Sequence, residues 1–121
     1  MNKEIKTIDT ATAEHFIWGS VCDGWHLLKQ SDLSIVQERV PPGAGEVKHV
    51  HNRAQQFFFI LSGSAVLELE DRTVHCVAGQ GISIPPGIVH RFANPGDQEV
   101  VFLVVSSPST IGDRMNVEPA A

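Results

Sequence analysis

Three histidines in this 121-residue chain have the spacing of metal ligands. His49 and His51 are separated by one residue, and His90 follows the turn-forming run Pro85-Pro86-Gly87. Side chains at positions i and i+2 of a β-strand point to the same face, roughly 6.5 Å apart. His49 and His51 can therefore both reach one cation at about 2.0–2.1 Å per bond. The pattern predicts a site in which one metal ion is surrounded by three imidazoles.

The residues around these histidines fall into two spaced motifs. The motifs consist of Gly43, His49, His51, Gln56 and Gly63, and of Gly79, Pro85, Gly87, His90 and Asn94. They resemble the two sequence motifs of the cupin superfamily, in which a His-x-His pair is followed by Glu and Gly, and a Pro-x-Gly turn by His and Asn. The resemblance covers close to half of the chain. It implies an all-β fold, the double-stranded β-helix or jelly-roll barrel.

Gln56 stands at the one position where the chain departs from the cupin pattern. The motif has a glutamate there, and only residue 56 leaves the six residues that must precede Gly63. The resemblance implies one divalent transition metal ion (Fe, Mn, Ni, Zn or Cu) held by His49, His51, Gln56 and His90. A neutral amide leaves the full +2 charge of the ion uncompensated, which favours an anionic or chelating substrate.

The glutamine also removes a proton acceptor, because an amide cannot take a proton as a carboxylate does. Glu38 and His26 are candidate replacements. A metal-bound water is a third, since the ion lowers the pKa of that water. The pattern assigns no catalytic residue among these three.

Strand alternation places apolar side chains beside the candidate ligands. Phe58 and Ile60 share a strand face with Gln56, and Phe92 shares one with the third histidine. Together with Glu38 they are expected to line a small-molecule pocket that is apolar around a charged centre. The alternative for Phe58 and Phe92 is that they fill the barrel interior.

The opposite face of the same expected strand carries three large apolar side chains, Phe57, Phe59 and Leu61. Such a face is normally buried against a second sheet or a partner subunit. Many cupins are dimers, and we expect a homodimer.

Short runs of β-branched and aromatic residues alternate with Gly, Pro and Asp clusters, which is typical of an all-β sandwich or barrel. The expected strands are Trp25–Lys29, Leu33–Val40, Glu46–His51, Gln55–Leu61, Ser64–Leu69, Thr73–Val77, Gly81–Ile84, His90–Ala93 and Val100–Ser106. Thr10–His15 is expected to form a helical turn, and the tail from Ile111 to fray. The length predicts one domain over 1–121, with an N-terminal segment 1–30, a barrel core 31–108 and a tail 109–121.

Composition excludes several classes of protein. The nine Lys and Arg residues are scattered and the net charge is -5, so a nucleic-acid partner is not expected. The N-terminus lacks the apolar stretch of a leader, and the longest apolar run, Val100–Val105, is far too short to span a membrane. We therefore expect a cytoplasmic protein without membrane contact. Cys22 and Cys76 have no partner at redox or metal spacing and are expected to be buried thiols.

Two classes of function remain. The first is a metalloenzyme for a small oxygenated or anionic substrate, with isomerase, lyase or dioxygenase chemistry. The second is a non-catalytic module that binds a sugar, a small acid or a metal. A sugar-phosphate substrate would need clustered cations, for which the candidates are Arg39, Lys48, Arg53 and Arg91. Cupin barrels host many unrelated reactions, so the fold alone does not decide.

Overall fold

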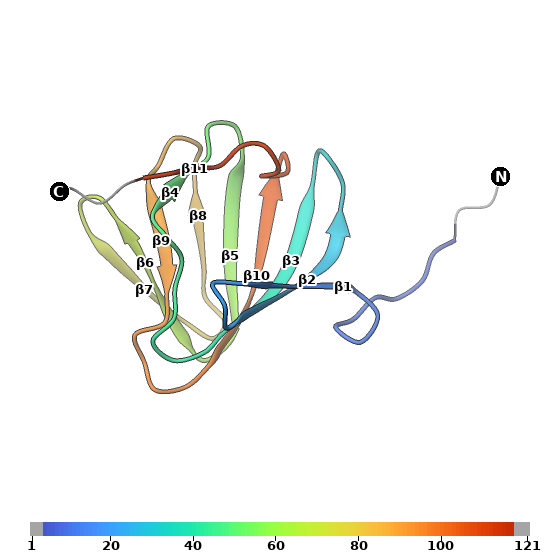
Figure 1. Ribbon diagram of the computed structural model, residues 1–121, viewed down its shortest axis with the longest axis horizontal. Helices are drawn as coiled ribbons and strands as arrows, with labels where there is room; N and C mark the ends of the chain where they lie inside the picture. Colours follow the sequence, from blue (N-terminus) through green and yellow to red (C-terminus); the bar gives the residue numbers. More distant parts are fainter. Residues whose placement is uncertain (1–3, 118–121) are drawn as a thin grey trace.

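The chain folds into two antiparallel sheets that face each other (Figure 1). The structure is a computed structural model, and it describes residues 4–117. Its strands are β1 (Glu14–Trp18), β2 (Cys22–Lys29), β3 (Ser34–Val40), β4 (His49–Val50), β5 (Gln55–Ser62), β6 (Ser64–Leu69), β7 (Thr73–Val77), β8 (Gly81–Ile84), β9 (His90–Ala93), β10 (Val100–Ser107) and β11 (Met115–Asn116). The larger sheet has the order β1-β2-β3-β10-β5-β8 and the smaller one β11-β4-β9-β6-β7. The all-β jelly-roll prediction is confirmed.

The core lies between the sheets because the central strands alternate strictly. On β5, Phe58 and Ile60 are buried, whereas Phe57 and Leu61 are 41% and 43% exposed. On β10 the even-numbered residues from 100 to 106 are buried in the same way. The inward aromatic rings stack, and the Phe92 and Phe102 centroids are 3.9 Å apart.

Two glycines occur where any side chain would be strained or would clash. Gly63 joins β5 to β6 at a φ of 80°, and an added Cβ would lie 2.4 Å from the Glu99 carbonyl oxygen. Gly87 has a φ of 85°, and its N–H donates to the His51 carbonyl oxygen at 2.8 Å. The Pro-Pro-Gly turn before β9 is thereby fastened to the His-x-His segment. Positive φ of this kind strongly favours glycine.

The N-terminal prediction was partly wrong. A turn does form. The Asp9 side chain accepts hydrogen bonds from the backbone N–H groups of Ala11 and Thr12, and the Asp9 carbonyl oxygen accepts one from the Ala13 N–H. It ends before Glu14, where the chain becomes β1 and pairs with β2. This pairing is with residues further along the chain, so the local pattern did not predict it.

The prediction of a frayed tail was wrong for the residues that the structure describes. Met115 and Asn116 form β11 and pair with Val50 and His49 of β4. In Figure 1 this segment crosses one end of the barrel, from the end of β10 to β4. Residues 118–121 of the predicted tail lie outside the described range. The expected strand Glu46–His51 is also shorter, since only His49–Val50 is assigned to a strand.

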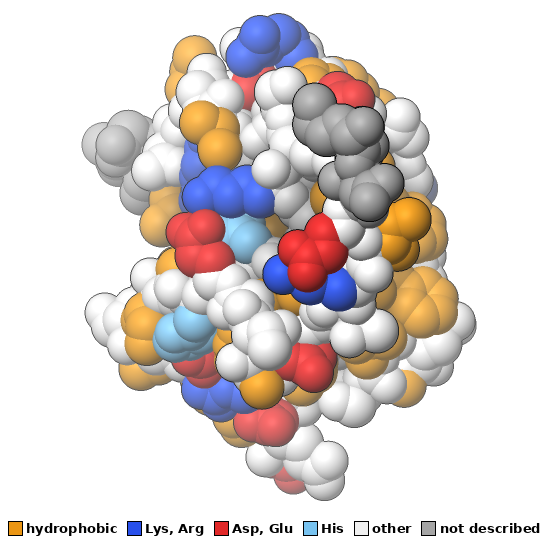
Figure 2. Space-filling view, turned by 90° about the vertical axis from the view of Figure 1, so that its right-hand side faces the viewer, with side chains coloured by type: hydrophobic (Ala, Val, Ile, Leu, Met, Phe, Trp, Pro, Cys, Tyr) orange, Lys and Arg blue, Asp and Glu red, His pale blue; other side chains and the backbone are white. Residues whose placement is uncertain are grey.

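The two cysteines are buried and unpaired, as predicted, and burial raises the pKa of both thiols. No helix of membrane-spanning length and apolarity occurs in residues 4–117. On the face shown in Figure 2, acidic and basic side chains lie interspersed rather than in a broad area of one sign.

Candidate metal centre

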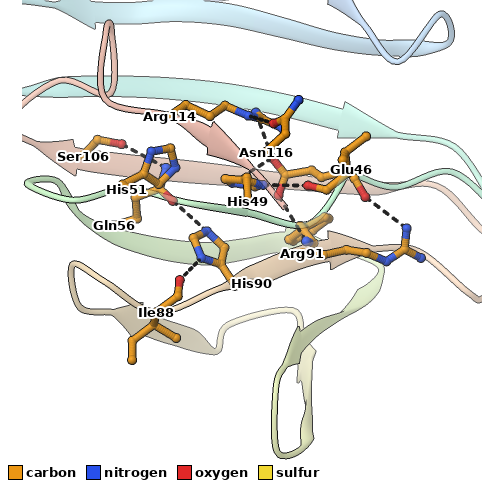
Figure 3. A network of polar contacts seen from close by, with 12 residues as sticks. Glu46, His49, His51, Gln56, Ile88, His90, Arg91, Ser106, Arg114 and Asn116 are labelled. Carbon is orange, nitrogen blue, oxygen red and sulfur yellow. Dashed lines mark hydrogen bonds and ion pairs between the residues drawn. The ribbon is translucent and has the colours of Figure 1, made fainter. Parts of the chain in front are cut away.

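The three histidine side chains converge on one another (Figure 3). They do so at the end of the barrel where β5 and β9 begin (Figure 1). His49 and His90 are direct partners across β4 and β9, and His51 follows β4 on the same side as His49. All three are at most 4% exposed. One ligand atom from each ring lies within 4.8 Å of the others, so the group can hold one metal ion.

Backbone carbonyls fix the protonation of each ring. The Nδ1 atoms of His49, His51 and His90 lie 2.7, 2.8 and 2.8 Å from the carbonyl oxygens of Val47, Asp113 and Ile88, respectively. A carbonyl oxygen can only accept, so each Nδ1 carries the hydrogen and each Nε2 presents a lone pair. In the neutral form of each ring, Nε2 is therefore the atom available as a ligand.

Gln56 lies beside these nitrogens, whereas its neighbour Gln55 is exposed. Gln56 Oε1 is 3.0 Å from His90 Nε2, and the Gln56 amide nitrogen donates to Ser106 Oγ at 3.3 Å. The hydrogen bond to Ser106 on β10 orients the amide so that the oxygen points toward the histidines. The amide oxygen is thus presented as a fourth ligand atom.

These donor atoms fit a divalent cation. The lone pairs of Gln56 Oε1 and His90 Nε2 face each other at 3.0 Å, an arrangement that a bound cation relieves. His51 Nε2 is buried without a hydrogen-bond partner among residues 4–117. Burial lowers the pKa of His49 to about 4 and also lowers the pKa of His90. Both rings are therefore neutral at pH 7, the form that binds metal.

Asp113 fixes the loop that carries His51. Its carboxylate accepts hydrogen bonds from the backbone N–H groups of Asn52, Arg53 and Ala54 at 2.8–3.3 Å. Burial alone would raise the pKa of Asp113, but these three donors together hold it below its ordinary value. The side chain of Asp113 fixes the loop and its carbonyl oxygen orients the ring, so together they position His51.

A cavity of about 380 Å³ opens beside the histidines. Its walls include aromatic side chains (Phe16, Trp18), aliphatic ones (Val36, Val104) and ionisable ones (His26, Lys29, Glu38, Glu46, Arg114). Of the four predicted lining residues, Glu38 lines this cavity. Phe58, Ile60 and Phe92 do not; they belong to the hydrophobic core, because each lies two or more residues further into the barrel than a ligand on the same strand.

Two carboxyl groups in the cavity wall, those of Glu38 and Glu46, have raised pKa values, which means that their ionised forms are less stable than usual. Burial and the nearby charge of Glu46 raise the pKa of Glu38 to about 8, although the Trp18 indole partly offsets this. Burial also raises the pKa of Glu46. Within residues 4–117 no basic side chain pairs with Glu38. Perturbed carboxyl groups of this kind in a cavity are typical of sites that move protons.

Comparison with known proteins decides the family. The sequence profile of the cupin domain matches residues 36–106, more than half of the chain. The protein is a cupin. The polyketide synthase protein CurC of Streptomyces cyaneus is 33% identical to this cupin over 67 residues, which are 55% of the chain and 44% of CurC. The chain thus aligns with less than half the length of that relative.

Solved structures share the fold at low sequence identity. The polyketide cyclase RemF of Streptomyces resistomycificus superposes with a TM-score of 0.81 and 22% identity, covering 97% of this cupin and 88% of RemF. An uncharacterised double-stranded β-helix protein of Klebsiella pneumoniae superposes with a TM-score of 0.79 and 22% identity. The match covers 96% of this cupin and all of that chain. At this identity the likeness shows the fold alone.

Sequence reasoning missed several residues that surround the site. Glu46 lies between two motif positions, and the sequence pattern predicts for it only a place in a strand, whereas it lines the cavity. Asp113 and Arg114 fall in the segment that was expected to fray. The only sequence signal for Glu46 was its position three residues before His49, and none pointed to the other two.

Proposed function

We propose that this cupin is a metal-dependent enzyme that acts on a small, oxygenated, anionic substrate by Lewis-acid chemistry, as isomerases and lyases do. The observation that carries the proposal is the convergence of three imidazole Nε2 lone pairs and the Gln56 amide oxygen at the wall of an accessible cavity. A divalent ion held there would polarise a substrate oxygen and lower the pKa of an adjacent C–H or of a bound water.

The chain's own residues supply the remaining roles. Glu38 keeps its proton near neutral pH and faces the cavity, so it can donate that proton and take one back. The buried Nδ1 of His26 has no hydrogen-bond partner among residues 4–117, and His26 lines the same cavity. Lys29 and Arg114 are the cavity's cations and are placed to bind a substrate anion.

Two observations bear on the chemistry and the substrate. CurC, which is 33% identical over 67 residues, is a polyketide synthase protein, and the carbonyl groups of polyketides are of the kind that Lewis acids activate. The four cations predicted as phosphate ligands, Arg39, Lys48, Arg53 and Arg91, do not line the cavity, which leaves Lys29 and Arg114 to bind the substrate anion. Arg91 instead pairs with Glu68 on the other side of β9.

The test combines metal analysis with turnover. Protein purified without chelators is analysed for Fe, Mn, Ni, Zn and Cu, and then assayed on diketones, hydroxy acids and uronic acids. His49→Ala is compared with His75→Ala, which changes an exposed histidine outside the cavity. We expect metal and turnover to be lost only in the first variant. Metal binding without turnover would indicate a binding module, and oxygen consumption a dioxygenase. A protein without affinity for any of these metals would refute the proposal.

A further inference from the structure

We propose that Glu46 supplies the negative charge of the metal centre that Gln56 does not, acting on the ion through an intervening water. The proposal rests on the metal-binding part of the proposed function. It does not depend on turnover.

Glu46 is held firmly in place beside the histidines (Figure 3). Its side-chain Oε1 accepts a hydrogen bond from the Phe92 backbone N–H at 3.1 Å, and its own N–H donates to the Phe92 carbonyl at 2.8 Å. Its carbonyl oxygen accepts from Arg91 at 3.0 Å. With one carboxylate oxygen fixed by β9, the other is aimed at the metal site.

That second oxygen, Oε2, lies 3.8 Å from His49 Nε2. The Nε2 atom presents a lone pair, because Nδ1 carries the hydrogen donated to Val47. When Glu46 is ionised, a carboxylate oxygen and an imidazole lone pair therefore face each other, and neither can donate a proton to the other. A cation bound at Nε2, or the water it carries, is the partner that suits both atoms.

The carboxylate acts from outside the group of direct ligands. The three histidine nitrogens lie within 4.8 Å of one another, and Glu46 is not among the residues that satisfy this limit together with them. Hydrogen-bonded groups around a metal orient its ligands and tune its affinity, and their removal typically weakens binding about 10–100-fold. A carboxylate in this position balances charge and leaves a coordination position for substrate.

Within residues 4–117, the one Lys or Arg side chain paired with this oxygen is weakly engaged. Arg114 lies 3.9 Å from Glu46 Oε2, and its side chain is 43% exposed, so solvent screens the pair. Among residues 4–117 no other Lys or Arg side chain approaches the Glu46 carboxylate within 4 Å. Burial destabilises the ionised form of Glu46 in the metal-free protein, so a cation bound at the histidines would be the main charge that stabilises this carboxylate.

The test is a charge swap measured by Zn²⁺ affinity, with a competing chelator and isothermal titration calorimetry. Glu46→Gln retains an acceptor for the Phe92 N–H and is expected to weaken Zn²⁺ binding about 10–100-fold. Glu46→Gln combined with Gln56→Glu moves the carboxylate from beside His49 to beside His90, and should restore affinity to within a few fold of wild type. Glu70→Gln makes the same change in net charge at an exposed turn and should leave affinity unchanged.

Each result decides a separate point. Unchanged affinity in Glu46→Gln, or an equal loss in Glu70→Gln, would overturn the proposal. If Glu46→Gln does not fold, Glu46→Asp provides the second arm: it keeps the charge but draws it back from His49, so Zn²⁺ binding should weaken several-fold, and unchanged affinity would refute the role of Glu46. Wild-type protein that binds no Zn²⁺ would remove the metal centre and the proposed function together. Zn²⁺ binding without turnover would remove only the enzymatic claim.

Discussion

The two ends of this barrel are built from the same strands but have opposite character. On β5, Gln56 faces the cavity and Ile60 the core, and on β9 His90 faces the site and Phe92 the core. At one end aromatic rings stack on one another. At the other end, imidazole and amide lone pairs surround a cavity.

The difference shows where stability and function are located. The aromatic end buries apolar surface, the dominant favourable contribution to folding. The polar end holds buried groups without protein partners, which cost about 1–3 kcal/mol each unless a ligand satisfies them. A substitution at the aromatic end should therefore change stability, and one at the polar end should mainly change binding.

The largest effect is expected from Phe102→Ala. Phe102 is 1% exposed and stacks on Phe92, so its removal leaves a cavity that costs about 3–5 kcal/mol of unfolding free energy. Urea denaturation followed by circular dichroism measures this loss. Zn²⁺ affinity of the remaining folded protein should stay within a few fold of wild type. A large loss of affinity with little loss of stability would contradict the division between the two ends.

His90→Ala is expected to show the opposite pattern. Loss of a direct ligand should weaken Zn²⁺ binding by more than about 100-fold, beyond the usual effect of a residue around the ligands. The unfolding free energy of the metal-free protein should fall much less than in Phe102→Ala. Calorimetric titration and urea denaturation of the same samples provide both numbers. Undiminished Zn²⁺ binding would remove His90 from the site.

Glu38→Gln should change how stability depends on pH. The pKa of Glu38 is about 8 in the folded protein against an ordinary 4.5, so between these values the folded state binds more protons than the unfolded state. Stability should therefore fall as pH rises through this window and level off above it. We expect the variant to gain about 1–2 kcal/mol over wild type between pH 5 and pH 8, less than the full linkage slope because water enters the cavity. The measurement is thermal unfolding of wild type and Glu38→Gln across this pH range. A constant difference between the two proteins at every pH would contradict the prediction.

The smallest effect on the fold is expected on the outer face of the larger sheet. Phe57 and Phe59 of β5 lie opposite Val105 and Leu103 of β10 and continue its apolar surface. We propose that a second copy of the chain covers this face. Leu61→Lys should convert the dimer to a monomer in sedimentation velocity at micromolar concentration, while unfolding of the monomer changes by about 0.5 kcal/mol or less.

Val77→Lys is the matched control for the dimer, because Val77 is 50% exposed on the other sheet. This variant should sediment as wild type. A wild-type protein that is monomeric at micromolar concentration would refute the proposed dimer.

Local sequence rules could predict the barrel and the meeting of the histidines. Strand alternation places His49 and His51 on one side, and a rigid Pro-Pro-Gly turn precedes His90. These rules could not predict which inward residues line the cavity. Depth along the strand decides this, and alternation makes Gln56 and Phe58 equivalent. Nor could they predict Asp113, whose contacts with the His51 loop connect positions about sixty residues apart.

The hydrogen bond from His51 to the Asp113 carbonyl has a consequence for the timing of folding. The two residues are 62 positions apart, and Asp113 lies close to the end of the described chain. Contacts between distant positions must first close a long loop and tend to form late. During synthesis, His51 cannot be oriented until Asp113 has left the ribosome. Competence to bind metal is therefore expected to appear only after synthesis has passed Asp113, so a nascent chain that already carries all three histidines still lacks a finished site.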